Sequence, residues 1–355
     1  MMEKKRVESY DWVRTIAIIL VVVGHGSYLA IETALGGVEY TLPSTLNGHY
    51  DDLLCKAIRS VGSWAYQFHM PLFFALSGAV TAITPMNSFD VMFEKKLRRL
   101  IIPYYVYGLL FMFPIKYMAG FYEREDFKYA MRSYLEISEC GHMWFLPVLF
   151  WCFIATYILL KLNKGRSLYL LFVVSFFIWK CIPINVEGYY GLTLCKEYLI
   201  WFVIGYIFEN KRRDTQILLT TKEQIIRIVS LSVVVWAMSG TLIKPDDFIS
   251  VLIKIYWIYC VATFSMNLLG IFRVIRKFVG VVSANCIYIY VFHDPLEYLV
   301  LKYAFKYNWL SSGYGVYFYF FARTMLVFLI SLYMGILITY ITKKWKKGRL
   351  AGSKC

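Results

Sequence analysis

The sequence lacks the short motifs that mark several large classes of enzyme and binding protein. Its eight cysteines include no Cys-x-x-Cys pair and no cysteine–histidine spacing typical of a zinc site, which excludes a zinc finger or ribbon. A phosphate-binding P-loop and the HExxH motif of zinc hydrolases are also missing. We therefore expect no metal ion and no permanently bound cofactor.

Charged residues are scarce as well. They make up 17% of the 355 residues, whereas hydrophobic residues make up 59%. An ordinary soluble domain is about 25% charged and roughly 45–50% apolar. No linker, low-complexity tract or short-period repeat interrupts the chain. Apolar runs long enough to cross a bilayer recur along it, so the sequence predicts one membrane-embedded domain over residues 1–355, without an appended soluble domain.

The net charge of +15 could suggest a nucleic-acid-binding protein, but its distribution argues against that class. The basic residues form short clusters between apolar runs, a pattern typical of cytoplasmic loops that meet anionic lipid. These clusters lie at residues 4–6, 95–99, 211–213 and 343–347. The expected partner is therefore the lipid bilayer and not nucleic acid, and a homo-oligomer is left open.

The apolar runs predict the fold class. They can be placed at residues 12–30, 63–84, 101–119, 143–161, 168–184, 195–209, 225–243, 249–270, 282–303 and 315–342. The predicted class is all-α: a polytopic membrane helix bundle of about ten transmembrane helices.

The basic clusters predict the orientation, with both termini cytoplasmic. The cytoplasmic segments are then 1–11, 85–100, 162–167, 210–224, 271–281 and 343–355, and the outer ones are 31–62, 120–142, 185–194, 244–248 and 304–314. Cys181 and Cys195 lie toward the outside in this topology, which leaves a disulfide between them open.

Two polar residues stand at the ends of RTIAIILVVVGH, residues 14–25, in the first apolar run. Arg14 and His25 are separated by about 1100° of helical rotation and roughly 16 Å of rise. Both therefore lie on one helix face, with Arg14 near the cytoplasmic end and His25 past the membrane midplane. An ionisable group at that depth is costly unless it faces a cavity or a partner, so His25 is a candidate functional residue.

Further polar residues within the apolar runs are predicted to line the same site. They are His69, Ser77, His142, Trp144, Ser283 and His293. The histidines are expected in the outer half of the membrane, near the depth of His25. Structural roles stay open, because His69 could be a hydrogen-bonding staple, His142 an interfacial residue, and Arg14 could reach lipid phosphate. The fifth histidine, His49, falls in a predicted outer segment.

These residues fit one kind of chemistry. A neutral imidazole can take a proton from a hydroxyl as a general base. Guanidinium groups bind phosphate in a bidentate manner, so Arg14, Arg98 and Arg99 would form a basic cytoplasmic mouth. Such a mouth combined with a deep base suits an activated acyl donor that enters from the cytoplasm. The residues by themselves leave this as one interpretation among several.

Five stretches, in this order, resemble the acyltransferase 3 family of integral-membrane acyltransferases. Among its members the likeness is to the fucose 4-O-acetylase-like sugar O-acetyltransferases. The stretches are the Arg14-to-His25 spacing, FHMPLFFALSG, KKLRRLIIPYY, HMWFLPVLF and SANCIYIYVFHDP. Each piece is weak by itself, but together they extend over nearly the whole chain.

The resemblance implies O-acetylation: an acetyl or other acyl group moves from acetyl-CoA, or another acyl-CoA, to a hydroxyl. The acceptor would be a cell-surface polysaccharide of the bacterial cell envelope or its lipid-linked precursor. Arg14 and His25 would be the essential pair, with His25 as catalytic base, and Arg98 and Arg99 would belong to the acyl-CoA site. ALSGA at residues 75–79 departs from the family pattern, which often has aromatic residues there, and predicts a different cavity shape.

Other functional classes fit less well. A proton-coupled transporter or flippase is the main alternative, because such carriers also hold intramembrane histidine and arginine. The sequence shows no two-fold internal repeat with paired broken helices, which many transporters have. An intramembrane serine protease is disfavoured because ALSG, residues 75–78, lacks the first glycine of GxSG. A haem protein would need histidine pairs that face one another.

Overall fold

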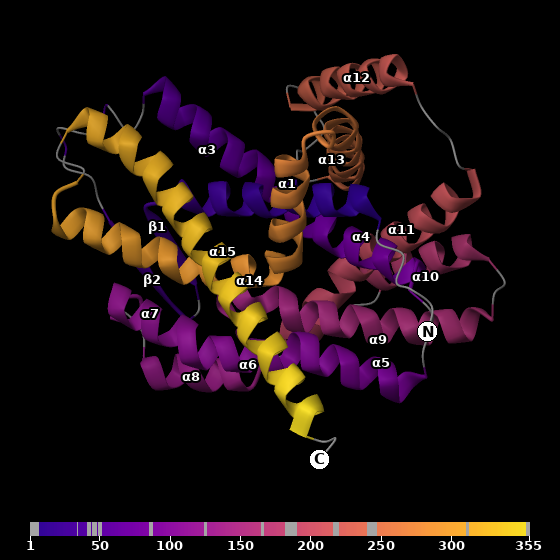
Figure 1. The fold of residues 1–355 in the computed structure, drawn as a ribbon, viewed down its shortest axis with the longest axis horizontal. Helices are drawn as coiled ribbons and strands as arrows, with labels where there is room; N and C mark the ends of the chain where they lie inside the picture. The colour runs from indigo at the N-terminus through magenta and orange to yellow at the C-terminus, as the bar shows by residue number, and fades with distance from the viewer. Residues whose placement is uncertain are drawn as a thin grey trace.

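The structure is a computed structural model that describes residues 7–33, 35–40, 44, 48, 52–84, 88–123, 126–164, 167–181, 190–215, 220–239, 247–309 and 312–352. Nearly every element is a helix (Figure 1). In chain order they are α1 (Glu8–Gly26), β1 (Ala30–Thr33), β2 (Gly36–Glu39), α3 (Leu53–Tyr66), α4 (His69–Ala82), α5 (Phe89–Lys96), η2 (Leu97–Ile101), α6 (Ile102–Tyr107), η3 (Gly108–Met112), α7 (Phe113–Ala119), α8 (Phe127–Leu135), η4 (Gly141–Trp144), α9 (Phe145–Asn163), α10 (Leu168–Cys181), α11 (Tyr190–Thr215), α12 (Thr221–Ser239), α13 (Phe248–Leu269), α14 (Arg273–Lys306) and α15 (Gly313–Gly352). The helical bundle predicted from the sequence is confirmed, with the addition of one antiparallel hairpin, β1–β2.

Six helical segments among the described residues are long and apolar enough to cross a membrane. They are Phe89–Ala119, Gly141–Asn163, Gly191–Arg213, Phe248–Leu269, Arg273–Lys306 and Tyr314–Trp345. The helices His69–Ala82 and Leu168–Cys181 are apolar but shorter. The chain is therefore a multi-pass helical membrane protein, while the count of about ten spans and the cytoplasmic termini stay predictions.

Helix α1 lies in the interior of the bundle. It packs against α3, α4, α13, α14 and α15, and Ala17, Ile18, Val21 and Val22 on it are almost completely buried. The long helix α15 crosses the molecule diagonally in Figure 1. Because neighbouring helices surround α1, its polar residues face protein groups or an internal cavity instead of lipid.

The single span predicted over residues 63–84 is two helices. Helix α3 ends at Tyr66 and α4 begins at His69. Pro71 lies in the first turn of α4, where its missing N–H costs no helical hydrogen bond. The break turns the chain between Tyr66 and His69, so the two residues present their rings to one another with centroids 4.7 Å apart.

The helix that contains the predicted span 101–119 begins earlier than expected, because residues 89–119 form one continuous helical segment. No glycine or proline lies between Ser88 and Ile102 to end the helix, and Lys and Arg are good helix formers. Two π-helical turns, η2 and η3, interrupt the α-helical geometry. The first of them carries Arg98 and Arg99; such insertions often occur at functional sites.

Helices α4 and α11 cross at unusually short distance. A Cβ on Gly78 would lie 1.8 Å from the carbonyl oxygen of Phe202, and a Cβ on Gly205 would lie 1.8 Å from that of Ala75. Small residues at such crossings let helix backbones meet in membranes. Ala75 and Gly78 therefore serve helix packing and do not line the large cavity described below, whereas Leu76 and Ser77 of the same stretch do line it.

The disulfide left open between Cys181 and Cys195 is absent. Cys181 is exposed and free, whereas Cys195 is buried with its Sγ atom 3.7 Å from that of Cys152. The predicted outer segments 31–62 and 120–142 contain the hairpin, α3 and α8. Residues 185–189 and 244–246 of the remaining predicted outer segments, 185–194 and 244–248, lie outside the described residues.

Candidate functional site

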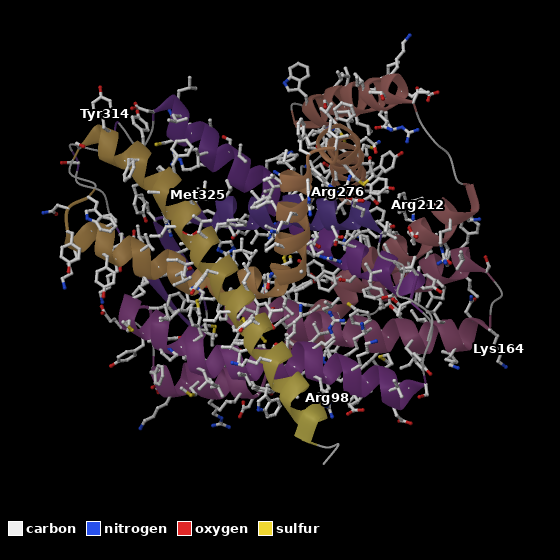
Figure 2. The ribbon with its side chains drawn as sticks, in the orientation of Figure 1. Arg98, Lys164, Arg212, Arg276, Tyr314 and Met325 are labelled. Carbon is white, nitrogen blue, oxygen red and sulfur yellow. The ribbon has the colours of Figure 1, made fainter. Side chains whose placement is uncertain are left out.

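A cavity of about 920 Å³ lies among α1, α4, α9, α14 and the helical segment that includes η2. Five residues predicted from the sequence line it: Arg14, Ser77, Arg98, Arg99 and Ser283. Lys95 and Lys96 add positive charge, and Asp11 is the only carboxylate among the described lining residues. Figure 2 shows Arg98 on the same side of the bundle as the C-terminal end of α15. The charge of the wall suits an anionic ligand.

Arg14 is held in position on the cavity wall by two partners. Its Nη1 donates to Ser283 Oγ at 2.9 Å and lies 3.4 Å from Asp11 Oδ1. Ser283 Oγ in turn donates to Asp11 Oδ1 at 2.6 Å. The Arg14 side chain remains 28% exposed, so part of its guanidinium can still meet a ligand. These contacts place Arg14 in the cavity and not at the lipid surface.

A second polar group lies deeper and is centred on the Asp294 carboxylate. Asp294 Oδ1 is 3.2 Å from His25 Nδ1, and Oδ2 is 3.0 Å from His142 Nδ1. Oδ2 also lies 2.7 Å from Lys116 Nζ. The side chains of Asp294 and Lys116 are each only 3% exposed, so the carboxylate is compensated by buried positive charge. We call these four residues the Asp294 centre.

Sequence reasoning did not single out Asp294 and Lys116 as site residues. Asp294 follows His293 directly, and Lys116 lies near the end of an apolar run. The signal that could have found Lys116 is its position, since an ionisable residue within a membrane span marks a functional site by default. Their pairing could not be read from the chain, because α7 and α14 are far apart in sequence.

His25 is oriented from both sides of its ring. Its Nδ1 faces Asp294, and its Nε2 lies 2.6 Å from the Tyr66 hydroxyl. A neutral imidazole that carries its proton on Nδ1, toward a carboxylate, leaves Nε2 as an acceptor. Tyr66 can approach because Gly24 and Gly62 face one another between α1 and α3, where a Cβ on Gly62 would lie 3.2 Å from Gly24 Cα.

The remaining predicted residues have different surroundings. His293 is fully buried, its ring lies 4.7 Å from that of His25 edge to face, and its Nδ1 is 2.7 Å from the Tyr290 carbonyl oxygen. His69 Nδ1 contacts the Ala65 carbonyl at 3.0 Å, as expected for a structural staple. Trp144 packs on Phe74 and Tyr198 and is not on the cavity wall. His49 lies outside the described residues.

A buried ion pair fixes the end of α1 next to His25. Arg323 on α15 lies 2.5 Å from Glu297 on α14, and both side chains are at most 2% exposed. Arg323 also donates to the carbonyl oxygens of Gly26 and Tyr28, at 3.1 and 2.7 Å. These bonds satisfy carbonyl groups that the end of a helix leaves free, and they hold α1 against α14 and α15.

Tyr122, in the segment after α7, lies near the Asp294 centre as a neutral group. Burial, and then the negative charge of Asp294, raise the pKa of its hydroxyl. Deprotonation would place a second negative charge beside Asp294 in a water-poor environment.

The cavity and the Asp294 centre are not joined. None of His25, His142 and His293 is on the cavity wall. The path from the basic mouth at Arg14 to His25, which a donor entering from the cytoplasm would follow, is therefore interrupted in this structure. Tyr290 lines the cavity and also lies against the rings of His142 and His293, with centroids 6.2 and 6.0 Å apart.

A bundle of apolar helices around a basic cavity and a buried histidine–aspartate–lysine centre defines an integral-membrane protein with a reactive polar interior. The acyltransferase 3 family, described as an acyltransferase domain, matches residues 7–344, and the chain belongs to this family. No curated protein and no solved structure matches the chain. The protein is therefore a membrane acyltransferase, and this activity replaces the transporter weighed against it.

Proposed function

We propose that this membrane acyltransferase moves an acetyl or other acyl group from acyl-CoA to a hydroxyl of a cell-surface glycan or its lipid-linked precursor. The observation that carries the proposal is the position of His25, between the Asp294 carboxylate and a hydroxyl 2.6 Å from Nε2. An imidazole oriented by a carboxylate with its other nitrogen on a hydroxyl is the arrangement of a general base.

In the proposed reaction His25 Nε2 takes the proton of the acceptor hydroxyl while that oxygen bonds to the thioester carbonyl carbon. The carbon–sulfur bond then breaks, and the leaving sulfur takes the proton from the imidazolium, so coenzyme A departs as a thiol. Asp294 stabilises the imidazolium between these steps. The hydroxyl on His25 Nε2 is that of a tyrosine, Tyr66, and not that of a serine nucleophile, so we propose direct transfer without an acyl-enzyme intermediate.

Tyr66 marks the side from which the acceptor approaches. Its residue surface is 37% exposed, and its hydroxyl occupies the position that an acceptor hydroxyl needs on His25 Nε2. We take the tyrosine hydroxyl as a stand-in that the sugar hydroxyl displaces. The acceptor then meets His25 at the α1–α3 edge, opposite to the cavity.

The cavity is the proposed donor site. Arg14, Arg98 and Arg99 would bind the phosphate groups of acyl-CoA, because guanidinium pairs with phosphate through two parallel hydrogen bonds. The donor is a substrate, so the protein needs no permanently bound cofactor. A phosphate-binding site at a basic cytoplasmic face fits a bacterial inner or plasma membrane, where acyl-CoA is available inside and glycan outside.

The test is acyl transfer by the full-length protein in bilayer discs with labelled acetyl-CoA and a panel of glycan acceptors. Wild type should transfer label, and His25→Ala should abolish transfer while the protein keeps its unfolding temperature. Mass spectrometry of surface polysaccharide from a deletion strain would identify the acceptor. Near-normal turnover by His25→Ala would reject the assigned base, and solute uptake without label transfer would reject acyl transfer altogether.

A further inference from the structure

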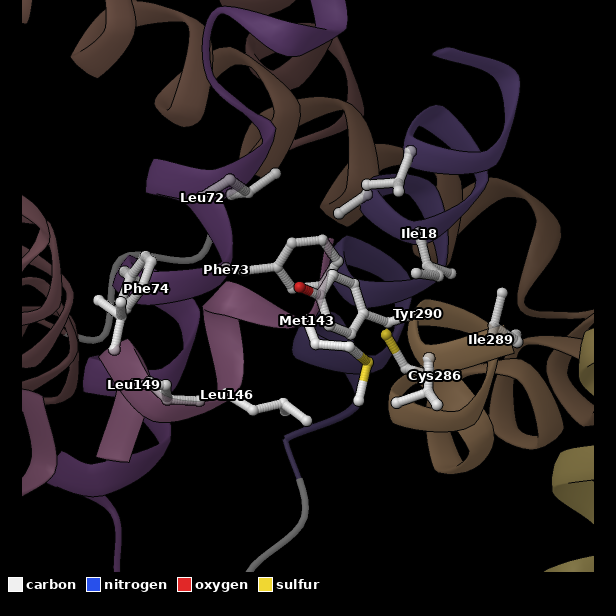
Figure 3. Close-up of a cluster of buried hydrophobic side chains, with 14 of the residues drawn as sticks. Ile18, Leu72, Phe73, Phe74, Met143, Leu146, Leu149, Cys286, Ile289 and Tyr290 are labelled. Atoms are coloured by element: carbon white, nitrogen blue, oxygen red, sulfur yellow. The ribbon is translucent and has the colours of Figure 1, made fainter. Parts of the chain in front are cut away.

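Aromatic rings from three helices line the cavity and meet one another beside the Asp294 centre. They are Phe73, Phe145 and Tyr290. The centroids of Phe73 and Phe145 are 6.0 Å apart, and those of Phe145 and Tyr290 are 5.5 Å apart. Figure 3 shows Phe73 from α4 and Tyr290 from α14 reaching into one cluster. We call these three residues the aromatic wall.

At Tyr290 a single ring lies between the cavity and the histidines. The Tyr290 ring meets the cavity and, on the histidine side, lies against His293 and His142. Its hydroxyl donates to the carbonyl oxygen of His142 and accepts from the Phe145 amide at 3.4 Å. Tyr290 is thus tied to the first turn of α9, and it is only 8% exposed.

Phe73 and Phe145 are the members of the wall with the weakest attachment. Their side chains have no polar atom, and both lie within the first two turns of their helices, α4 and α9. A phenylalanine can change rotamer without breaking a side-chain hydrogen bond, whereas Tyr290 would lose its bond to His142. Opening of the wall therefore requires Phe73 or Phe145 to move first.

We infer that the aromatic wall is the acyl-selectivity element of the donor site, a barrier that admits a small acyl group to His25 and excludes longer chains. The inference rests on the proposed function, because it takes the cavity as the acyl-CoA site. The thioester carbon must reach the hydroxyl on His25 Nε2, so the acyl group has to pass this wall. A long chain would need space that the closely packed rings occupy.

The test measures binding of non-hydrolysable acetyl and hexanoyl thioether analogues of coenzyme A to the purified full-length protein. Wild type should bind the acetyl analogue more tightly. Phe73→Ala and Phe145→Ala should shift the ratio of the two affinities toward hexanoyl by about tenfold, because the removed ring leaves apolar space for additional methylene groups. If these variants do not fold, Phe73→Leu should give a smaller shift of about threefold.

Phe113→Ala is the matched control. Phe113 on α7 is also a buried phenylalanine, but it packs on Tyr122, Phe127 and Tyr134 and does not line the cavity. It should leave the affinity ratio unchanged. An unchanged ratio in both wall variants while coenzyme A still binds, or an equal shift in Phe113→Ala, would overturn the inference alone. Failure of wild type to bind any coenzyme A analogue would reject the proposed donor site, and the inference with it.

Discussion

At the scale of single residues, the carboxylate of Asp294 joins elements that the chain keeps apart. His25, His142 and Lys116 come from α1, the turn η4 and α7, and all meet one side chain of α14. The buried carboxylate of Asp294 is stable only because the ammonium of Lys116 compensates its negative charge and the two imidazoles lie against its oxygens. The same contacts fix the ring of His25 for proton transfer.

Replacement of Asp294 separates these two roles. Asp294→Asn leaves Lys116 as an uncompensated buried charge, so it should lower the free energy of unfolding by about 3–5 kcal/mol. It should also reduce acyl transfer by about 10²–10⁴-fold, because His25 loses its orienting carboxylate. Unfolding by denaturant and turnover of labelled acetyl-CoA measure the two effects.

The double variant Asp294→Asn with Lys116→Met is the control for this prediction. It removes the unpaired ammonium, so stability should return toward wild type while transfer stays low. Recovery of transfer together with stability would show that Asp294 serves only the fold.

The variant Tyr66→Phe tests whether the tyrosine hydroxyl occupies the position of the acceptor hydroxyl. Tyr66→Phe removes a hydrogen bond to His25 Nε2 of about 1 kcal/mol, so the acceptor no longer has to displace it. The KM for the acceptor should fall by up to about fivefold, with kcat within about threefold of wild type. Both constants are measured by steady-state kinetics at varied concentrations of the acceptor. Tyr28→Phe is the comparison, since the Tyr28 ring contacts the His25 ring edge to face and its hydrogen bond to His25 is a backbone one, from N–H to the carbonyl oxygen. A loss of kcat above about 100-fold in Tyr66→Phe would show instead that this hydroxyl takes part in proton transfer.

At the scale of elements, the π-helical turn η2 presents two adjacent arginines to the cavity. An arginine–phosphate contact is charge-assisted and contributes about 1.5–3 kcal/mol. The loss of one such contact would raise the KM for acetyl-CoA by about 10–100-fold, so the double variant Arg98→Gln/Arg99→Gln should raise it by about 10-fold or more and change kcat little. Arg276→Gln is the matched control, because Arg276 is a surface arginine paired with Glu8 that does not line the cavity. An unchanged KM in the double variant would remove the two arginines from the donor site.

The crossing of α4 and α11 is the other element that positions the site, since α4 carries Phe73 and Ser77. Gly205→Ala would place a Cβ 1.8 Å from the Ala75 carbonyl oxygen, so it should cost about 1–3 kcal/mol or more and lower the unfolding temperature. Gly191→Ala in the same helix should be tolerated, because its Cβ would lie 3.4 Å from Trp151, an ordinary contact. The measurement is the thermal unfolding of both variants in detergent. Equal unfolding temperatures would contradict the close packing of α4 and α11 at Gly205.

At the scale of the whole molecule, the basic clusters predict that both termini are cytoplasmic. A tag at either end should resist protease added to right-side-out vesicles and be cleaved in inside-out vesicles. Native Cys181, which is exposed and free, should react with an impermeant thiol reagent only in right-side-out vesicles. Cleavage of one tag and protection of the other would mean an odd number of spans.

The membrane class and the choice of candidate residues could be predicted from composition and helical periodicity, because both depend on properties local to the chain. The residues at which helices begin and end were less predictable. Residues 89–119 continue as one helix through a basic cluster that resembles a loop, and residues 63–84 break before Pro71. In both cases the helix boundary follows from the absence or presence of a helix-breaking residue and not from hydropathy.

The sequence by itself determined a helical membrane protein with Arg14 and His25 on one face of its first helix, since the spacing along a helix is fixed geometry. Only the tertiary structure decided that Arg14 belongs to a cavity with Ser283, and that His25 belongs to a separate centre with Asp294 and Lys116. It also placed Tyr290 between the cavity and the histidines of this centre. The reason is physical: a buried charge selects its partners by three-dimensional proximity, and that proximity depends on helix packing over hundreds of residues.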